Sequence, residues 1–261
     1  MIRADVAALL LEKADHYNRP AFIEQDPLSI PRRFTKKQDI ELIGFWTAML
    51  AWGGRSVILR KASELVAMMD GAPHDFVRGH TAKDKKRFAA FKHRTFNAED
   101  ALYFLNFFQA YYAKHDSLED AFCADGGKPW GKSTLSIEPA LLNFAEHFES
   151  YPGFPERTRK HVSSPSRASA CKRLCMYLRW MVRSDNRGVD FGLWKRIKPR
   201  QLVMPMDVHV VRVSKALGLM GDAAVNWNAA LALTNTLKEL DANDPVRFDY
   251  ALFGLGVEGK M

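Results

Sequence analysis

The chain has 261 residues, of which 47% are hydrophobic and 26% are charged, a composition typical of a folded globular protein and not of a disordered one. No run of the sequence approaches the roughly 20 apolar residues of a membrane span, and its first residues lack the apolar segment of a signal peptide. We therefore expect a cytoplasmic protein with no membrane partner. The formal net charge of +8 favours a polyanionic partner, of which nucleic acid is the most common.

The cysteines and histidines exclude several kinds of site. The three cysteines, Cys123, Cys171 and Cys175, cannot all pair, and none of them forms a Cys-x-x-Cys motif. Neither a disulfide framework nor a zinc or iron–sulfur site is therefore expected. The histidines show no metal-ligand spacing, so we expect no metal and no cofactor.

Helical periodicity dominates the chain. Residues 39–52 are apolar around most of their circumference, as in a helix buried inside a bundle, and Gly53 and Gly54 end that helix. Apolar residues then recur at helical spacing, and alternating strand-like runs are missing. The further predicted helices span residues 55–70, 98–113, 137–148, 168–182, 207–217, 226–240 and 244–255. This pattern predicts an all-α fold.

Two polar loops interrupt the later helices. Residues 155–173 carry six Lys or Arg side chains next to a helix N-terminus, where exposed amides favour anions. The loop can bind phosphate or can simply be a solvated charged loop. In residues 185–200 aromatic residues alternate with cations, which suits nucleic acid, although Phe191 and Trp194 can equally anchor the loop to the core. The expected phosphate contacts of the first loop are Arg157, Arg159, Lys160, Ser166, Arg167 and Arg173.

Asp207 follows a proline at the start of an amphipathic helix. A carboxylate there can accept a hydrogen bond from an amide of the first turn as an N-cap, and the helix dipole keeps it ionised. The same ionised oxygen can stabilise a positive charge that develops on a substrate. His209, two positions later, lies about 200° around the helix from Asp207 and is expected to be a packed or hydrogen-bonded residue.

The order of these elements resembles the helix-hairpin-helix DNA glycosylase superfamily, and more closely an uncharacterised bacterial branch known only as a domain of unknown function. Residues 206–212, Met-Asp-Val-His-Val-Val-Arg, are similar to the superfamily's Val-Asp-x-His-Val-x-Arg segment. Residues 41–56 resemble its early buried helix and DNA-facing turn. Residues 170–174, Ala-Cys-Lys-Arg-Leu, stand where the superfamily places a catalytic lysine, and residues 248–256 resemble its last core helix. The resemblance spans about residues 38–257.

The resemblance implies a two-lobed helical fold and a role in DNA repair. One lobe would comprise about residues 38–155, and the other residues 156–257 with the N-terminal segment. Damaged double-stranded DNA would be the partner of a monomeric, nucleoid-associated protein. The resemblance implies that Asp207 is the essential acid and Lys172 the catalytic lysine.

These residues would act on the N-glycosidic bond between the base and the sugar. Breaking an N-glycosidic bond builds positive charge on the sugar, which an ionised Asp207 near C1′ would stabilise. Lys172 would attack C1′ as a neutral amine, a form favoured by the cation of Arg173 and by the helix N-terminus. The damaged base must leave the stack, and the candidates for its pocket are Trp52, Gly53, Gly54 and Arg55, with Trp52 equally a core residue.

Two departures from the superfamily pattern keep a second function open. The superfamily hairpin reads Leu-Pro-Gly-x-Gly, whereas residues 162–169 contain no glycine. The interval from Lys172 to Asp207 is also long, because residues 183–199 look inserted. The resemblance therefore implies a DNA glycosylase, a hydrolase with abasic-site lyase activity. The alternative is a DNA-binding module that keeps the glycosylase fold without catalysis.

Overall fold

The computed structural model describes residues 1–124, 127–131 and 133–259, which form two compact units. Unit 1 contains Met1–Glu24, Pro129–Leu142 and Ser164–Met261, and unit 2 contains Gln25–Lys128 and Asn143–Ser163. The chain therefore enters each unit more than once. The expected lobes were residues 38–155, and residues 156–257 with the N-terminal segment; in the structure, residues 129–142 belong to unit 1 and residues 156–163 to unit 2.

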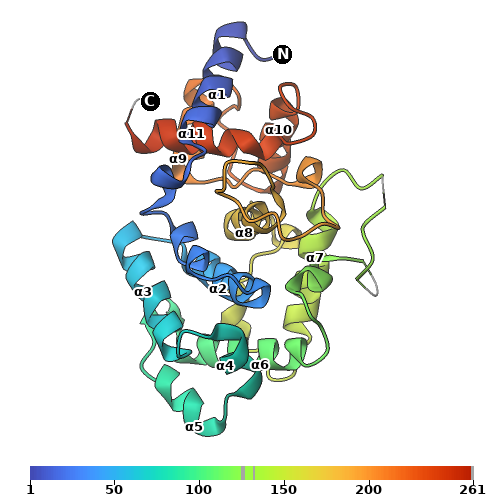
Figure 1. Cartoon of the computed structure of the whole chain (residues 1–261). Coiled ribbons are helices and arrows are strands. Elements are labelled where there is room, and N and C mark those ends of the chain that lie inside the picture. Colours follow the sequence, from blue (N-terminus) through green and yellow to red (C-terminus); the bar gives the residue numbers. More distant parts are fainter. Residues whose placement is uncertain (125–126, 132, 260–261) are drawn as a thin grey trace. The chain divides into compact units, whose positions relative to one another are not determined.

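Unit 1 is helical, and its last helix is its centre. α11 packs on α1 and on α9 (Figure 1). The apolar side chains Val6, Leu10 and Ala14 repeat every fourth residue along α1 and are buried. α1 is not among the helices predicted from the sequence. The helices of unit 1 are α1 (Ala4–Tyr17), α8 (Lys172–Val182), α9 (Val208–Ala216), α10 (Trp227–Leu237) and α11 (Asp249–Val257), with the first part of α7 (Glu138–Glu149).

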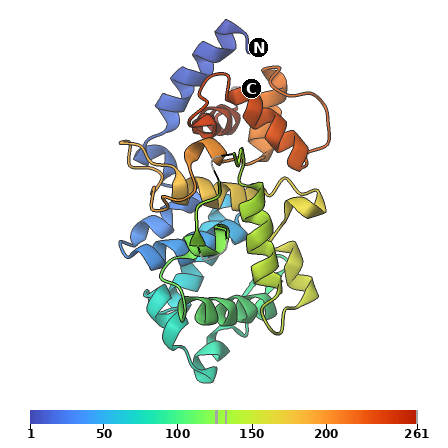
Figure 2. The same ribbon diagram turned by 90° about the vertical axis from the view of Figure 1, so that its right-hand side faces the viewer.

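Unit 2 is built around α2, in which every residue from Asp39 to Leu50 is buried. An aromatic core surrounds this helix: the Phe45 ring lies 5.3 Å from the rings of Phe108 and Phe144. α4 packs on α6, and the two labels lie side by side in Figure 1. Figure 2 shows the same chain turned by 90°. The helices of unit 2 are α2 (Lys37–Leu50), α3 (Arg55–Met68), α4 (Pro73–Gly79), α5 (Ala82–Lys85) and α6 (Ala98–Tyr112), with the second part of α7.

The all-α prediction is confirmed, because helices dominate the described residues. One local feature differs from the expectation of no strands. β1 (Lys92–His93) and β2 (Phe96–Asn97) form a short antiparallel hairpin, which Arg94 turns with a φ of 54°. Strands of two residues are too short to show an alternating pattern in the sequence.

We predict that Gly254 is required for the packing of α1 on α11. A Cβ atom at Gly254 would overlap the ring of Tyr17, whose hydroxyl donates a hydrogen bond of 2.7 Å to Glu258. Gly254→Ala should lower the free energy of unfolding by about 1–3 kcal/mol, measured by urea denaturation. Gly221→Ala in the same unit, where an added Cβ would meet nothing within 4 Å, is the control. Equal stability of the two variants would contradict this packing.

Candidate active site

The structure brings Lys172 and Asp207 together. The Lys172 Nζ atom lies 2.5 Å from Asp207 Oδ2, although 35 positions (207 − 172) separate the two residues in the sequence. The side chain of Lys172 is 33% exposed and that of Asp207 is 16% exposed. Reagents can therefore reach the amine, while the carboxylate is largely shielded from water.

Asp207 occupies its position as the N-cap of α9. Its Oδ1 atom accepts a hydrogen bond of 2.9 Å from the backbone N–H of His209, and its Oδ2 atom faces Lys172. Extended backbone at Asp207 precedes the helix, as expected for an N-cap. The two roles considered for this residue are therefore compatible, because one oxygen caps the helix and the other remains available to Lys172.

The segment before α8 contains no glycine, yet two of its residues adopt the left-handed backbone conformation that glycine favours. Ala168 and Cys171 have φ values of 54° and 49°, in the left-handed region that glycine favours. The Ser169 hydroxyl accepts a hydrogen bond from the Cys171 N–H at 3.1 Å, which supports this turn. The helix consequently begins at Lys172, not at residue 168 as the periodicity predicted, because left-handed residues cannot continue a right-handed helix.

Two pKa shifts belong to this site. Burial raises the pKa of the Asp207 carboxyl, but the charge and hydrogen bond of Lys172 outweigh it and hold that pKa below its ordinary value. Burial lowers the pKa of the Arg173 guanidinium to about 10. At neutral pH Asp207 is therefore ionised and Arg173 is a cation.

A buried charge cluster follows Lys172 along α8. Arg179 pairs with Asp249 and lies 3.4 Å from Asp190, and Arg179, Asp190 and Asp249 are all buried. Arg183 is also buried, with its Nη1 atom 3.1 Å from Asp190 Oδ2. The Tyr250 hydroxyl donates a hydrogen bond of 2.7 Å to Asp190. Both arginines are thus held by carboxylates from other segments of unit 1.

This cluster was not predicted from the sequence, although the spacing of its cations carries a signal. Residues 172 and 179 are seven positions apart on α8, which places their side chains on one face, and Arg183, four positions later, is the C-cap of that helix. Arginines inside an otherwise apolar helix are rarely buried unless they are paired. Arg183 Nε also lies 2.9 Å from Asp244 Oδ2. Finding the partners required the tertiary structure, because Asp190, Asp244 and Asp249 lie in different segments.

The aromatic residues of the 185–200 segment anchor it to the core. Trp194 is 1% exposed, and its ring meets that of Tyr177 at 5.4 Å. The backbone N–H groups of Phe191 and Trp194 donate hydrogen bonds to the carbonyls of Trp180 and Met181 at the end of α8. These contacts favour the anchoring role over a nucleic-acid contact for Trp194.

Arg157 and Arg159 are engaged by carboxylates in unit 2. Arg157 Nη1 lies 2.5 Å from Asp100 Oδ2, and Arg157 Nη2 donates a hydrogen bond of 2.9 Å to the Thr95 carbonyl. Arg159 pairs with Glu149 at 2.9 Å. A phosphate would have to compete with these internal partners for either arginine.

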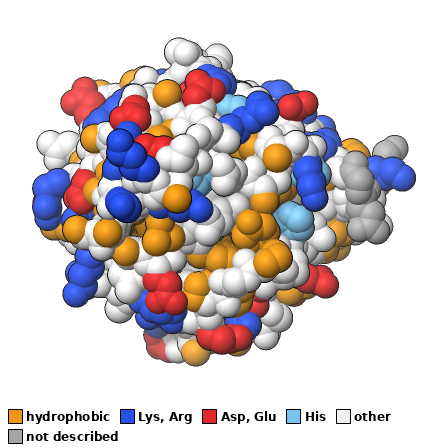
Figure 3. All heavy atoms as spheres, turned by 90° about the horizontal axis from the view of Figure 1, so that it is seen from below, with side chains coloured by type: hydrophobic (Ala, Val, Ile, Leu, Met, Phe, Trp, Pro, Cys, Tyr) orange, Lys and Arg blue, Asp and Glu red, His pale blue; other side chains and the backbone are white. Residues whose placement is uncertain are grey.

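The remaining predicted phosphate contacts are divided between the units. Lys160 is exposed and belongs to unit 2, whereas Ser166 and Arg167 are exposed in unit 1, near the half-buried Arg173. On the face drawn in Figure 3, Lys and Arg side chains are interspersed with Asp and Glu. That face therefore gives no support to a concentrated basic patch.

The candidates for the base pocket lie together at the end of α2. Trp52 is half-buried, its ring is covered by the Arg94 guanidinium at 5.5 Å, and its edge meets the His93 ring. Gly53 has a φ of 104°, and a Cβ there would lie 2.5 Å from Arg94 Nε. Gly54 is the N-cap of α3, which Arg55 begins. These residues belong to unit 2, and Lys172 and Asp207 belong to unit 1.

His209 packs against α11. Its ring meets that of Phe253 at 5.7 Å, and Arg212 Nη2 lies 3.4 Å from its Nδ1 atom. These contacts agree with the expected packed histidine.

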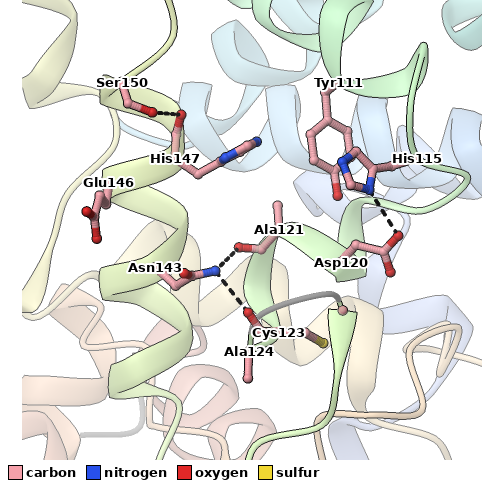
Figure 4. A pocket seen from close by; sticks show the side chains of 11 residues that line it. Tyr111, His115, Asp120, Ala121, Cys123, Ala124, Asn143, Glu146, His147 and Ser150 are labelled. Atoms are coloured by element: carbon pink, nitrogen blue, oxygen red, sulfur yellow. Dashed lines mark hydrogen bonds and ion pairs between the residues drawn. The ribbon is translucent and has the colours of Figure 1, made fainter.

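Unit 2 also contains a pocket of about 530 Å³ (Figure 4). Tyr111 stacks on His115 at 4.5 Å, and His115 Nδ1 lies 3.5 Å from Asp120. Burial, followed by the charges of neighbouring residues, lowers the pKa of His147 on the opposite wall. None of the residues predicted for catalysis or DNA binding lines this pocket.

Metal and membrane features are not found in the part of the chain that the structure describes. No group of three or more His, Cys, Asp or Glu side chains there could hold a metal ion. None of the helices there combines the length and apolar character needed to cross a bilayer. All three cysteines are buried and unpaired with one another.

Comparison with known protein families gives one match. The sequence model of DUF2400, described as a protein of unknown function, matches residues 26–258. The chain belongs to this family. No curated protein and no solved structure matches the chain. The matched range of this DUF2400 protein includes Lys172, Asp207 and the buried charge cluster.

We predict that Asp100 makes the stability of unit 2 sensitive to acid. Burial alone would raise the pKa of Asp100, but hydrogen bonds from His161, Asn97 and other donors hold it well below its ordinary value. Its contribution to stability is therefore complete above the unfolded value of about 4 and is lost as the pH falls below it. Asp100→Asn should be less stable at pH 7, and its free energy of unfolding should fall less steeply between about pH 4 and pH 2. Parallel pH profiles of the two proteins would contradict this role.

Proposed function

We propose that this chain is a DNA base-excision glycosylase with abasic-site lyase activity, in which Lys172 and Asp207 carry out the chemistry. The observation that carries the proposal is the 2.5 Å contact between Lys172 Nζ and Asp207 Oδ2. A partly exposed amine next to an ionised, largely shielded carboxylate provides the two groups that such a reaction needs.

The arrangement defines a route for the proton. The amine of Lys172 can attack C1′ of the damaged nucleoside only after it loses a proton, and Asp207 is placed to accept it. Attack forms a C–N bond, while the bond to the base breaks and the base leaves with the bonding electrons and takes up a proton. Opening of the sugar then gives a Schiff base with Lys172. Loss of a C2′ proton from the Schiff base eliminates the 3′ phosphate and cuts the strand.

The start of α8 is suited to bind phosphate beside this pair. Its N-cap residue, Cys171, provides no capping hydrogen bond from its side chain, and the first helical residues are the cations Lys172 and Arg173. The exposed side chains of Ser166 and Arg167 lie in the preceding turn. Backbone amides at a helix N-terminus, together with cations, favour an anion. Phosphate bound there would bring the DNA backbone to the segment that carries Lys172.

We expect borohydride to trap a covalent adduct between the protein and duplex DNA that carries an oxidised purine, because reduction makes a Schiff base permanent. Lys172→Gln should abolish trapping, and Lys195→Gln, at an exposed lysine of the same unit, should leave it unchanged. Asp207→Asn should slow excision by about 100- to 1,000-fold and leave DNA binding largely intact. An Asn at that position can still cap α9.

Two outcomes would contradict the catalytic proposal in different ways. Trapping that persists in Lys172→Gln would identify another amine as the nucleophile. Retained duplex binding, without excision from a panel of oxidised, alkylated and deaminated bases, would favour the non-catalytic DNA-binding module.

We predict that duplex affinity depends on the exposed cations Arg167 and Lys160. Affinity should fall by nearly one log unit per log unit of salt for each phosphate contact. Arg167→Glu and Lys160→Glu should each weaken binding to all sequences alike and reduce that slope, whereas Lys83→Glu on α5 should change neither. Fluorescence anisotropy over a salt series measures both quantities. An affinity that is independent of salt would contradict phosphate binding.

A further inference from the structure

Val208 is an apolar residue that faces solvent at the start of α9. It is 70% exposed, whereas Val210, Val213 and Ser214 on the same helix are buried. Successive residues of a helix are rotated by about 100°, so Val208 lies on the side of α9 opposite to these three residues. The exposed Arg212, one turn later, lies on the same side as Val208. Val208 therefore takes no part in the core of unit 1.

The surroundings of Val208 distinguish it from other exposed apolar residues, which are common singly on protein surfaces. Val208 directly follows Asp207, and the Cα atoms of consecutive residues lie about 3.8 Å apart. Asp207 Oδ2 lies 2.5 Å from Lys172 Nζ, and the Lys172 side chain is 33% exposed. A molecule that reaches this amine from solvent thus lies within reach of the valine methyl groups as well.

The chemistry of the sugar defines what such an apolar neighbour can distinguish. In the proposed reaction, Lys172 attacks C1′ of the target nucleotide, and C2′ is bonded directly to C1′. DNA has a methylene group at C2′, whereas RNA carries a hydroxyl there. Valine methyl groups accommodate a methylene. A hydroxyl held against them would lose water without gaining a hydrogen-bond partner, which is unfavourable.

We propose that Val208 contacts C2′ of the target nucleotide and makes the site selective for deoxyribose over ribose. The inference rests on the proposed function, which places C1′ at Lys172. Val208 determines specificity in this arrangement and takes no part in breaking bonds. An apolar site rejects a ligand that adds one hydroxyl by up to about 100-fold. Since one residue covers only one side of the sugar, we expect a preference of about tenfold.

The inference is tested by binding, with no chemical step. Two DNA duplexes each carry one base-free analogue of the target nucleotide. One analogue is tetrahydrofuran, which has hydrogen at C2′, and the other is its 2′-hydroxyl counterpart. Fluorescence anisotropy gives the Kd of each, and the wild-type protein should bind the tetrahydrofuran duplex about tenfold more tightly.

Two matched substitutions assign this preference to Val208. Val208→Thr replaces a methyl group by a hydroxyl of similar size, which offers the ribose hydroxyl a partner. The ratio of the two Kd values should therefore fall to about one. Val225, a valine of the same unit that is 45% exposed, provides the control, because Val225→Thr should keep the wild-type ratio. Any effect of the ribose on duplex shape is the same for all proteins and cancels in this comparison.

A second variant guards against misfolding of the first. Val208→Ala removes the methyl groups that meet C2′, so it should weaken binding of the tetrahydrofuran duplex and also lower the ratio. Circular dichroism checks that each variant is folded. A wild-type ratio near one, a ratio that Val208→Thr leaves unchanged, or an equal fall in Val225→Thr would overturn the inference. Failure of the wild-type protein to bind either duplex would also overturn it, because no sugar would then reach Val208.

Base excision separates the inference from the proposed function. Excision with the same kcat/KM from damaged nucleotides with and without a 2′ hydroxyl would overturn the inference and leave the proposed function standing. A preference in binding that depends on Val208, without excision by the wild-type protein, would support the inference and reject the glycosylase. The chain would then be the non-catalytic DNA-binding module.

Discussion

The pairing of the cations of α8 with carboxylates is the constraint on which unit 1 depends. Arg179 and Arg183 are buried, and a buried guanidinium is tolerated only when carboxylates neutralise it. Their partners come from α11, from the segment between α8 and α9 and from the turn before α11. Because each partner belongs to a different segment, satisfying the charges of one helix also determines where those segments pack. Lys172, at the start of α8, is also paired with a carboxylate, that of Asp207, but its side chain is partly exposed.

The turn before α8 adopts left-handed backbone conformations at residues other than glycine. Ala168 and Cys171 are held in left-handed conformations, each of which costs on the order of 1–2 kcal/mol for a residue with a side chain. Hydrogen bonds of Ser164 with Ser166 and of Ser169 with Cys171 support the turn. Backbone strain of this kind persists only where its surroundings enforce it, and it occurs often at functional sites. Here the turn makes Lys172 the first residue of α8, within reach of Asp207.

Positive charge has two different uses in the described residues. In unit 2, Arg157 and Asp100 join the start of α6 to the 156–160 segment, so this arginine stabilises the fold. In unit 1, Arg167 is exposed and Lys172 is partly exposed at the start of α8, where we propose that phosphate binds. The net charge of +8 therefore does not measure the cations available to nucleic acid, because internal carboxylates engage some of them.

Helical periodicity and residue type determined much of the architecture. The burial of α2 on all sides, the cap at Asp207 and the end of α2 before Gly53 follow from apolar spacing and local backbone chemistry, which act within one or two turns of chain. The contact of Lys172 with Asp207 could be expected only from the order of motifs, because no local rule relates residues 35 positions apart. The start of α8, the burial of Arg179 and Arg183 and the membership of residues 129–142 in unit 1 were decided by tertiary packing. The physical reason is that the cost of a buried charge, or of a left-handed alanine, depends on partners that folding brings from distant segments.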